Sequence, residues 1–202
     1  IIIPQDTSGK VRFMKQAKVL DDAELKRVLA IAAQNKHAAR NRMALLLSHY
    51  AGLRVGEIAT LRWSDVVGTD GEIKQQFYLK PENTKSNEAR PVHVSKRLQR
   101  ELATYKSCLT QKLRFTDPLI PSQKRGEFSA NSLCQLFGRL YREAGIDGAT
   151  SHSGRRWFIT RLAHSGVSPK VIMTLAGHRS LATTQRYIDV NDEMMSKAVE
   201  IL

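Results

Sequence analysis

Apolar residues recur every three or four positions through most of this chain of 202 residues. That spacing lines up side chains on one face of an α-helix and gives each helix a face to bury. The chain is therefore expected to fold mainly as packed helices. The segments with this pattern, together with their expected cap and stop residues, are 21–32, 43–52, 55–61, 98–109, 129–145, 151–166, 168–177 and 180–187.

Residues 63–94 depart from the helical spacing, because apolar and polar residues alternate there as they do in half-buried strands. A polar segment at 81–87, between the two alternating stretches, is typical of a hairpin end. The fold class predicted for the chain is α+β, mainly α-helical with one small antiparallel β-sheet. The alternating apolar positions are Phe77, Leu79, Val92 and Val94.

Short polar side chains that commonly cap helices stand at the expected helix starts. Glycines follow several of the segments, where helices commonly end. The candidate caps are Asp21 or Asp22, Ser129, Ser151 or Ser153, Ser168 before Pro169, and Ser180.

The charge of the chain points to an anionic partner. It carries 32 Lys and Arg against 19 Asp and Glu, a formal net charge of +13. An excess of this size favours nucleic acid or an anionic surface. The basic residues are spread through foldable segments and form no polybasic tail. A basic domain that binds neither partner is the alternative.

Membrane and secreted classes are disfavoured. The longest unbroken apolar run, Val28 to Ala33, has six residues and is far too short to cross a membrane. No basic segment leads a longer apolar run at the N-terminus, so no signal peptide is predicted. Cys108 and Cys134 are too few for a disulfide framework or a cysteine zinc site. We therefore expect a cytoplasmic protein with no membrane partner.

Metal and nucleotide chemistry are also disfavoured by the sequence. It has no H-E-x-x-H motif, no glycine-rich phosphate loop and no Cys/His ligand spacing. Asp21 and Asp22 are typical of a helix cap, and the acidic residues at 189–193 of a turn between helices. We therefore expect no metal and no cofactor.

Arg54 and Glu57 lie three positions apart, within the segment Gly-Leu-Arg-Val-Gly-Glu-Ile at 52–58, and share a helix face. A surface ion pair is the common meaning of such spacing. However, Arg54 stands between a turn glycine and apolar residues, which indicates partial burial. A partly buried guanidinium needs an anion, and Glu57 can hold it in place for a second anion such as a phosphate.

His152 and Arg155 are also three positions apart, at a predicted helix start. Helix N-termini favour anions, and both side chains can donate hydrogen bonds to a phosphate. A histidine near a cap and a solvated arginine are the alternative.

Tyr187 follows His178 by nine positions. A tyrosine oxygen can act as a covalent nucleophile. Its free pKa of about 10 makes it a weak one unless nearby cations stabilise the phenolate or donors take up its proton. Lys85, at the hairpin end, can be such a cation or a proton donor. Ordinary packing of the tyrosine and a solvated turn lysine are the alternatives.

Together these residues predict one reaction. Two arginines and a histidine can stabilise the charge that builds on a phosphodiester, without a metal. Tyr187 would attack phosphorus, and Lys85 or a histidine would protonate the leaving sugar oxygen. The bond energy would be kept in a phosphotyrosine, so a DNA hydroxyl could reverse the step without ATP.

The chain resembles the catalytic domain of tyrosine recombinases, the phage integrase family, from about residue 19 to 195. The boxes stand in family order with fitting gaps, although Gly154 replaces what is more often a larger apolar residue. The matching segments are 52–58, Thr84-Lys85-Ser86 followed by Arg90-Pro91-Val92, His152 with Arg155, Leu175-Ala176-Gly177-His178, and Thr184-Gln185-Arg186-Tyr187.

The resemblance implies DNA strand cutting and rejoining through a 3′-phosphotyrosine link, on a homotetramer bound to two duplexes. Accessory DNA-bending proteins are a further partner class to consider. The implied site residues are Arg54 and Arg155 as a phosphate clamp supported by Glu57, Lys85 as donor to the 5′-oxygen, His152 in proton transfer, His178 as a phosphate ligand, and Tyr187 as nucleophile.

The resemblance also implies a domain organisation. Residues 1–18 resemble the linker to an N-terminal DNA-clamping domain, which we expect to be missing from this chain, and 19–202 form the catalytic domain. An apolar stripe from Met195 to Leu202 predicts a tail helix at about 191–202. This helix either packs on its own domain or docks on a neighbouring subunit.

Two other functions stay open from sequence alone. A type IB topoisomerase shares the tyrosine chemistry but would relax supercoils as a monomer. A non-catalytic DNA-binding protein could use 169–176 and 180–187 as a helix-turn-helix. That second reading leaves Arg54, Lys85 and the two histidines without a role.

Overall fold

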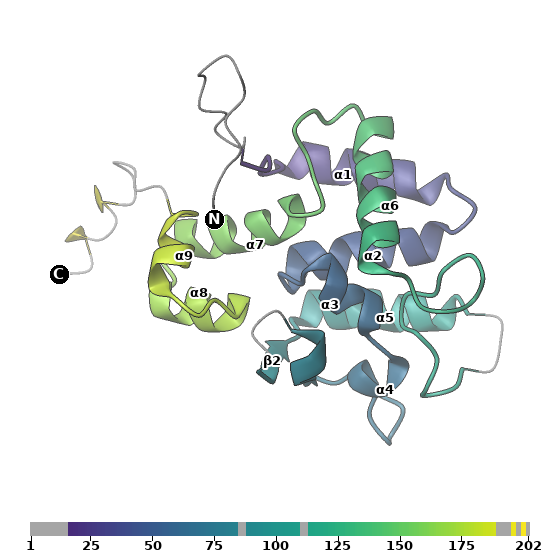
Figure 1. Cartoon of the computed structure of the whole chain (residues 1–202). Coiled ribbons are helices and arrows are strands. Elements are labelled where there is room, and N and C mark those ends of the chain that lie inside the picture. The colour runs from purple at the N-terminus through teal and green to yellow at the C-terminus, as the bar shows by residue number, and fades with distance from the viewer. Residues whose placement is uncertain (1–15, 85–87, 110–112, 189–194, 197–198, 201–202) are drawn as a thin grey trace, which may run out of the picture.

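The central element of the fold is helix α2 (Ala38–Tyr50), which packs against α1, α3, α5 and α7. The computed structural model describes residues 16–84, 88–109, 113–188, 195–196 and 199–200. Five consecutive side chains of α2, Met43–Leu47, are fully or almost fully buried. Figure 1 shows α2 among its neighbours, with α7, α8 and α9 gathered at one end of the molecule.

The remaining helices follow the predicted segments. The starts at Asp21, Ser129 and Ser180 are confirmed, since each side chain accepts a hydrogen bond from a backbone N–H of the first turn. Their bounds are α1 Asp22–Ala33, α3 Val55–Thr60, α4 Trp63–Val66, α5 Lys96–Ser107, α6 Ala130–Glu143, α7 Ser153–His164, α8 Pro169–Ala176 and α9 Leu181–Gln185.

The predicted sheet is a two-stranded antiparallel hairpin of β1 (Gln76–Leu79) and β2 (Arg90–His93), with Gln76 opposite His93. The short helix α4 and a 3₁₀ turn at Pro81–Asn83 also lie in this part of the chain, and the sequence pattern did not predict them. The prediction of a mainly α-helical α+β fold is confirmed.

The predicted cap at the start of α7 is wrong. Its N-cap residue is His152, which makes no side-chain cap bond, and neither Ser151 nor Ser153 fills that role. The Ser153 hydroxyl instead accepts from the backbone N–H of Thr150 at 2.9 Å, which closes the preceding turn. At α8, Ser168 stands at the N-cap position without a side-chain bond, and Pro169 begins the helix as expected.

The buried apolar residues form two clusters. The larger fills the space between α1–α6 and the hairpin. A smaller one consists of Ile159, Ala163, Ile172 and Ala176, and Tyr187 packs against it. The helices α7 and α8 that build this small cluster also contact α2 and β2, respectively. The two clusters are therefore joined through the contacts of α7 with α2 and of α8 with β2.

Several predictions fall outside the described residues. These are Lys85, most of the predicted linker at 1–18 and most of the predicted tail helix at about 191–202. None of the helices that the structure describes is both long and apolar enough to cross a bilayer.

Candidate active site

Glu57 organises the first part of the site. Gly52, with φ of +63°, turns the chain after α2, and Arg54 becomes the N-cap residue of α3. The Glu57 carboxylate, 2% exposed, accepts from the Arg54 backbone N–H at 2.9 Å and from Arg54 Nη1 at 2.8 Å. The Arg54 side chain remains 25% exposed. The acid thus orients a guanidinium that can still reach a ligand.

Arg90 is a member of this cluster that motif reasoning did not assign. Its Nη2 donates to Glu57 Oε2 at 2.8 Å and its Nη1 to the carbonyl of Leu175 at 2.7 Å. Burial lowers its pKa, and the nearby Glu57 carboxylate opposes that effect. A sequence signal was present, because Arg90 and Val92 occupy the same face of a strand whose Val92 points into the core.

The Arg90 side chain depends on Gly177, which ends α8 with φ of +63°. A Cβ at Gly177 would lie 2.3 Å from Arg90 Cδ. Only glycine therefore provides both the left-handed backbone and the space for this arginine.

Arg155 links three segments of the site from the first turns of α7. It is 4% exposed. Its Nη1 donates to the Gly52 carbonyl at 2.7 Å, and its Nη2 donates to the Ala176 carbonyl. Burial, and next the positive charge of Arg54, lower the pKa of Arg155 to about 9, so the group stays protonated at neutral pH.

His178 and Tyr187 lie face to face. Their ring centroids are 5.8 Å apart with an angle of 22° between the planes. His178 Nδ1 lies 2.9 Å from the hydroxyl oxygen of Thr184, and the Arg156 guanidinium lies 5.8 Å from the centre of the Tyr187 ring. Arg156 and Thr184 were also not assigned from sequence.

The charged groups of the site affect one another's pKa values. Burial, and next the positive charges of Arg155, Arg54 and Arg90 in that order, lower the pKa of His178 to about 4. At Arg155, where burial is the largest cause of the lowered pKa, Tyr187 acts weakly in the opposite direction. His178 is therefore a neutral ring among cations near pH 7.

The structure brings together five of the seven predicted site residues: Arg54, Glu57, Arg155, His178 and Tyr187. His152 is exposed and lies one helical turn before Arg155, at the N-cap of α7. Lys85 lies outside the described residues.

The cluster can hold one anionic group beside a nucleophile. Arg54 and Arg90 pair with the one carboxylate of Glu57, and the nearby Arg155 donates only to carbonyl oxygens, which leaves an excess of positive charge. Arginine forks match the oxygens of a phosphate. A tyrosine oxygen near a phosphate held in this way can attack phosphorus. Within the described part of the chain, no three His, Cys, Asp or Glu side chains come together as a metal site would require.

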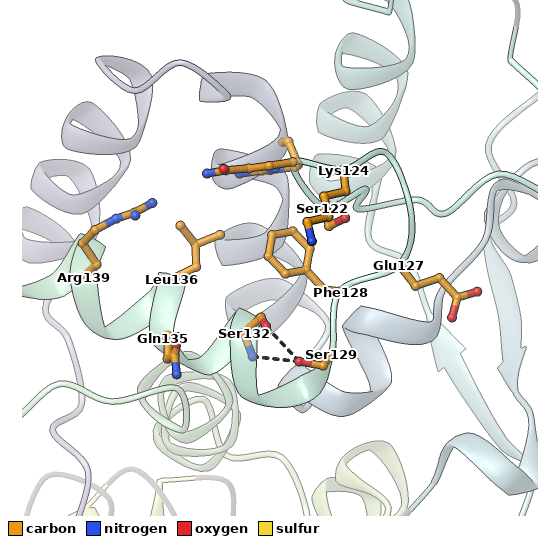
Figure 2. Close-up of a pocket in the computed structure, with 11 residues that line it drawn as sticks. Ser122, Lys124, Glu127, Phe128, Ser129, Ser132, Gln135, Leu136 and Arg139 are labelled. Carbon is orange, nitrogen blue, oxygen red and sulfur yellow. Dashed lines mark hydrogen bonds between the residues drawn. The ribbon is translucent and has the colours of Figure 1, made fainter.

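A second basic region lies along α6. A hollow of about 650 Å³ is lined there by Arg40, Lys124 and Arg139 together with Phe128. Figure 2 shows Lys124, Phe128 and Arg139 around it. Arg40 is 6% exposed and lies over the Phe128 ring, 5.0 Å from its centre. Because α6 packs on α3, this hollow is on an element that directly supports the Arg54 segment.

Comparisons with known proteins identify the family of this chain. The sequence model of the phage integrase family matches residues 18–194. Tyrosine recombinase XerA of Thermococcus kodakarensis is 30% identical over 183 residues, which cover 91% of this chain and 62% of the relative. Transposase A from transposon Tn554 of Staphylococcus aureus is 29% identical over 193 residues, covering 90% and 51%. The chain thus spans little more than half the length of these relatives.

Solved structures share the fold. A crystal structure of XerA recombinase has a TM-score of 0.72 and 25% identity, covering 93% of this chain and 64% of the other. The Tn1549 transposon integrase in complex with transposon right end DNA has a TM-score of 0.75 at 18% identity, covering 98% and 70%. The predicted recombinase catalytic-domain fold is therefore confirmed.

Proposed function

The chain belongs to the phage integrase family, and from this membership we propose that it is a site-specific DNA recombinase acting through a 3′-phosphotyrosine intermediate. The observation that carries the proposal is the stacking of Tyr187 on His178, two residues after the Ala176 carbonyl to which Arg155 donates. One site therefore holds the proposed nucleophile Tyr187, the neutral hydrogen-bond donor His178 and the buried cation Arg155.

The proposed cleavage step is a phosphoryl transfer. Arg54 and Arg155 bind the non-bridging oxygens of the scissile phosphate, and Glu57 with Arg90 holds Arg54 in position. Tyr187 Oη attacks phosphorus, so an O–P bond forms and the bond from phosphorus to the 5′-oxygen breaks. The positive site stabilises the charge that builds on the phosphate oxygens.

Proton transfer completes the step. Lys85 protonates the leaving 5′-oxygen, and His152 serves in proton transfer from the phenol. These two assignments rest on the family resemblance. Reversal by a 5′-hydroxyl rejoins the strand, because the phosphotyrosine keeps the energy of the phosphodiester.

Double-stranded DNA is the proposed partner, and the hollow beside α6 is a proposed contact to its backbone. Arg40, Lys124 and Arg139 give this hollow its positive charge. The loss of one phosphate contact makes the negative slope of log affinity against log salt shallower by about 1. We expect Lys124→Ala and Arg139→Ala to show this change and Lys26→Ala, exposed on α1 outside the hollow, not to show it.

The assembly follows from the same family. We propose a homotetramer on two duplexes, with residues 1–18 as a linker and 19–202 as the catalytic domain. The tail at about 191–202 would pack in cis or exchange between subunits, and accessory DNA-bending proteins could assist. This assignment makes the protein a cytoplasmic, DNA-associated one.

A covalent-adduct assay tests the function. A binding site is first selected from a pool of randomised duplexes and then used as a nicked suicide substrate. We expect a denaturation-resistant adduct that forms equally in a chelator. Tight binding without an adduct would favour a non-catalytic DNA-binding protein, and relaxation of supercoils by isolated monomers would favour a topoisomerase.

A further inference from the structure

Thr184 contacts both aromatic groups of the site. Its side chain is fully buried in α9. The hydroxyl oxygen is 2.9 Å from His178 Nδ1, and the backbone carbonyl accepts from the N–H of Tyr187 at 3.0 Å. One residue thus contacts both the histidine and the tyrosine that stack on each other.

The protonation state of the His178 ring depends on the groups around it. Burial and the charges of Arg155, Arg54 and Arg90 keep the ring neutral near pH 7. A neutral imidazole has one proton for its two nitrogens, so one nitrogen donates and the other accepts. The hydrogen bond at Nδ1 therefore decides whether Nε2, at the other edge of the ring, donates or accepts.

The Thr184 hydroxyl also needs an acceptor for its proton. Among the described residues, His178 Nδ1 is the hydrogen-bond partner recorded for this hydroxyl. If Nδ1 carried the ring proton, the buried Thr184 proton would lack an acceptor there, which costs about 1–3 kcal/mol. If Thr184 donates to Nδ1, both groups are satisfied and the ring proton lies on Nε2.

We propose that Thr184 is a positioning residue that fixes His178 in the Nε2–H form. This proposal rests on the proposed function, in which His178 donates a hydrogen bond to the scissile phosphate. Nδ1 is held by Thr184, so Nε2 is the nitrogen left to face that phosphate. The same residue anchors Tyr187 through its carbonyl, and so sets the nucleophile and the donor together.

Nitrogen NMR of histidine-labelled protein without DNA tests the tautomer directly, whatever the protein's activity. His178→Gln identifies the His178 signals by their loss. We expect the wild-type protein to carry the His178 proton on Nε2 and to show a hydrogen-bonded, unprotonated Nδ1. Thr184→Val should remove that hydrogen bond, Thr184→Ser should keep it, and the neighbouring Thr183→Val should leave the spectrum of His178 unchanged. A wild-type ring protonated at Nδ1 would overturn the proposal.

The adduct assay then tests the consequence. Because the valine keeps the shape of threonine but has no hydroxyl, we expect Thr184→Val to slow adduct formation at least tenfold with unchanged DNA affinity. Thr184→Ser should restore the rate to within threefold of wild type. Equal rates for wild type and Thr184→Val would overturn the positioning role. If wild type forms no adduct on its selected site, the proposed function fails while the NMR result stands by itself.

Discussion

Glu57 accepts a 2.8 Å hydrogen bond from Arg90, a residue that lies 33 positions later in the sequence. The side chains are 2% and 8% exposed, so the pair is almost completely removed from water. The same carboxylate accepts two bonds from Arg54. One acid therefore holds two arginines close together that would otherwise repel each other.

Replacing this acid should damage stability as well as activity. We expect Glu57→Gln to lower the free energy of unfolding by about 3 kcal/mol, because it leaves a buried guanidinium without its counter-charge. Urea denaturation measures the change. Glu101→Gln is the matched control, because the Arg42–Glu101 pair has the similar length of 2.7 Å but side chains that are 39% and 23% exposed.

The control pair should contribute less than about 1 kcal/mol, as partly exposed pairs do. Similar small losses in both variants would contradict the structural role given to Glu57.

Tyr187→Phe should separate binding from chemistry. The phenylalanine ring can keep the stacking on His178, so we expect an unchanged fold and DNA affinity within about twofold of wild type. The covalent adduct should be absent because the attacking oxygen is lost. Tyr78→Phe, at a residue that is 62% exposed, should form the adduct normally. An adduct formed by Tyr187→Phe would show that another residue is the nucleophile.

Arg155→Lys should be severe although it keeps the charge. The guanidinium donates in two directions, to the carbonyls of Gly52 and Ala176, and a single ammonium group cannot span both. We expect adduct formation to slow by about 10²-fold or more, as for loss of a donor to a charged transition state. Arg161→Lys, exposed on the same helix, is the control and should react at the wild-type rate. Near-normal cleavage by Arg155→Lys would argue against a phosphate clamp.

Sequence patterns predicted the parts of this molecule that local rules decide. Periodic apolar residues gave the helices, and short polar residues such as Asp21 and Ser129 gave their starts. The motif residues were proposed because each sits in a distinctive short segment. Arg90 was passed over because its partner is far away in sequence, and no spacing rule connects it to Glu57.

The start of α7 shows how tertiary packing overrides a local rule. Ser153 was a reasonable cap, but its hydroxyl closes the turn before the helix and leaves His152 at the cap position. The neighbouring Gly154 lies against α2, where a Cβ would be 2.5 Å from Ser48 Oγ and 2.8 Å from His49 Nδ1. The contact explains why the larger apolar residue usual in the family does not fit here.

Gly154→Ala should therefore destabilise the protein. The added methyl group would push α7 away from α2 and move Arg155, and we expect a loss of about 1–3 kcal/mol in the free energy of unfolding together with slower adduct formation. Gly138→Ala is the control with the opposite sign. It lies inside α6 with its nearest neighbour, Arg142 Nη1, at 3.7 Å. Alanine there should stabilise the helix by about 0.5–1 kcal/mol. A gain in both variants would show that α7 is not closely packed on α2.

The buried His49 should make stability depend on pH. It is fully buried, its Nδ1 donates to the Leu45 carbonyl at 2.8 Å, and burial lowers its pKa to about 4. In the unfolded chain His49 binds a proton below its ordinary pKa of about 6.5. Between about pH 6.5 and pH 4 the unfolded state therefore binds more protons than the folded state. The contribution of His49 to stability is complete above about pH 6.5 and is lost as the pH falls toward 4.

The size of this loss follows from the shift and is about 3 kcal/mol between pH 7 and pH 4. Urea denaturation of wild type and His49→Phe over this range measures the loss as the difference between the two pH profiles. The contributions of His37 and His178, whose pKa values burial also lowers, are common to both proteins. His93→Gln, at an exposed position, should keep the wild-type profile. Parallel profiles for wild type and His49→Phe would mean that His49 is accessible to protons in the folded protein, and that the contact between α2 and α7 is looser than the structure has it.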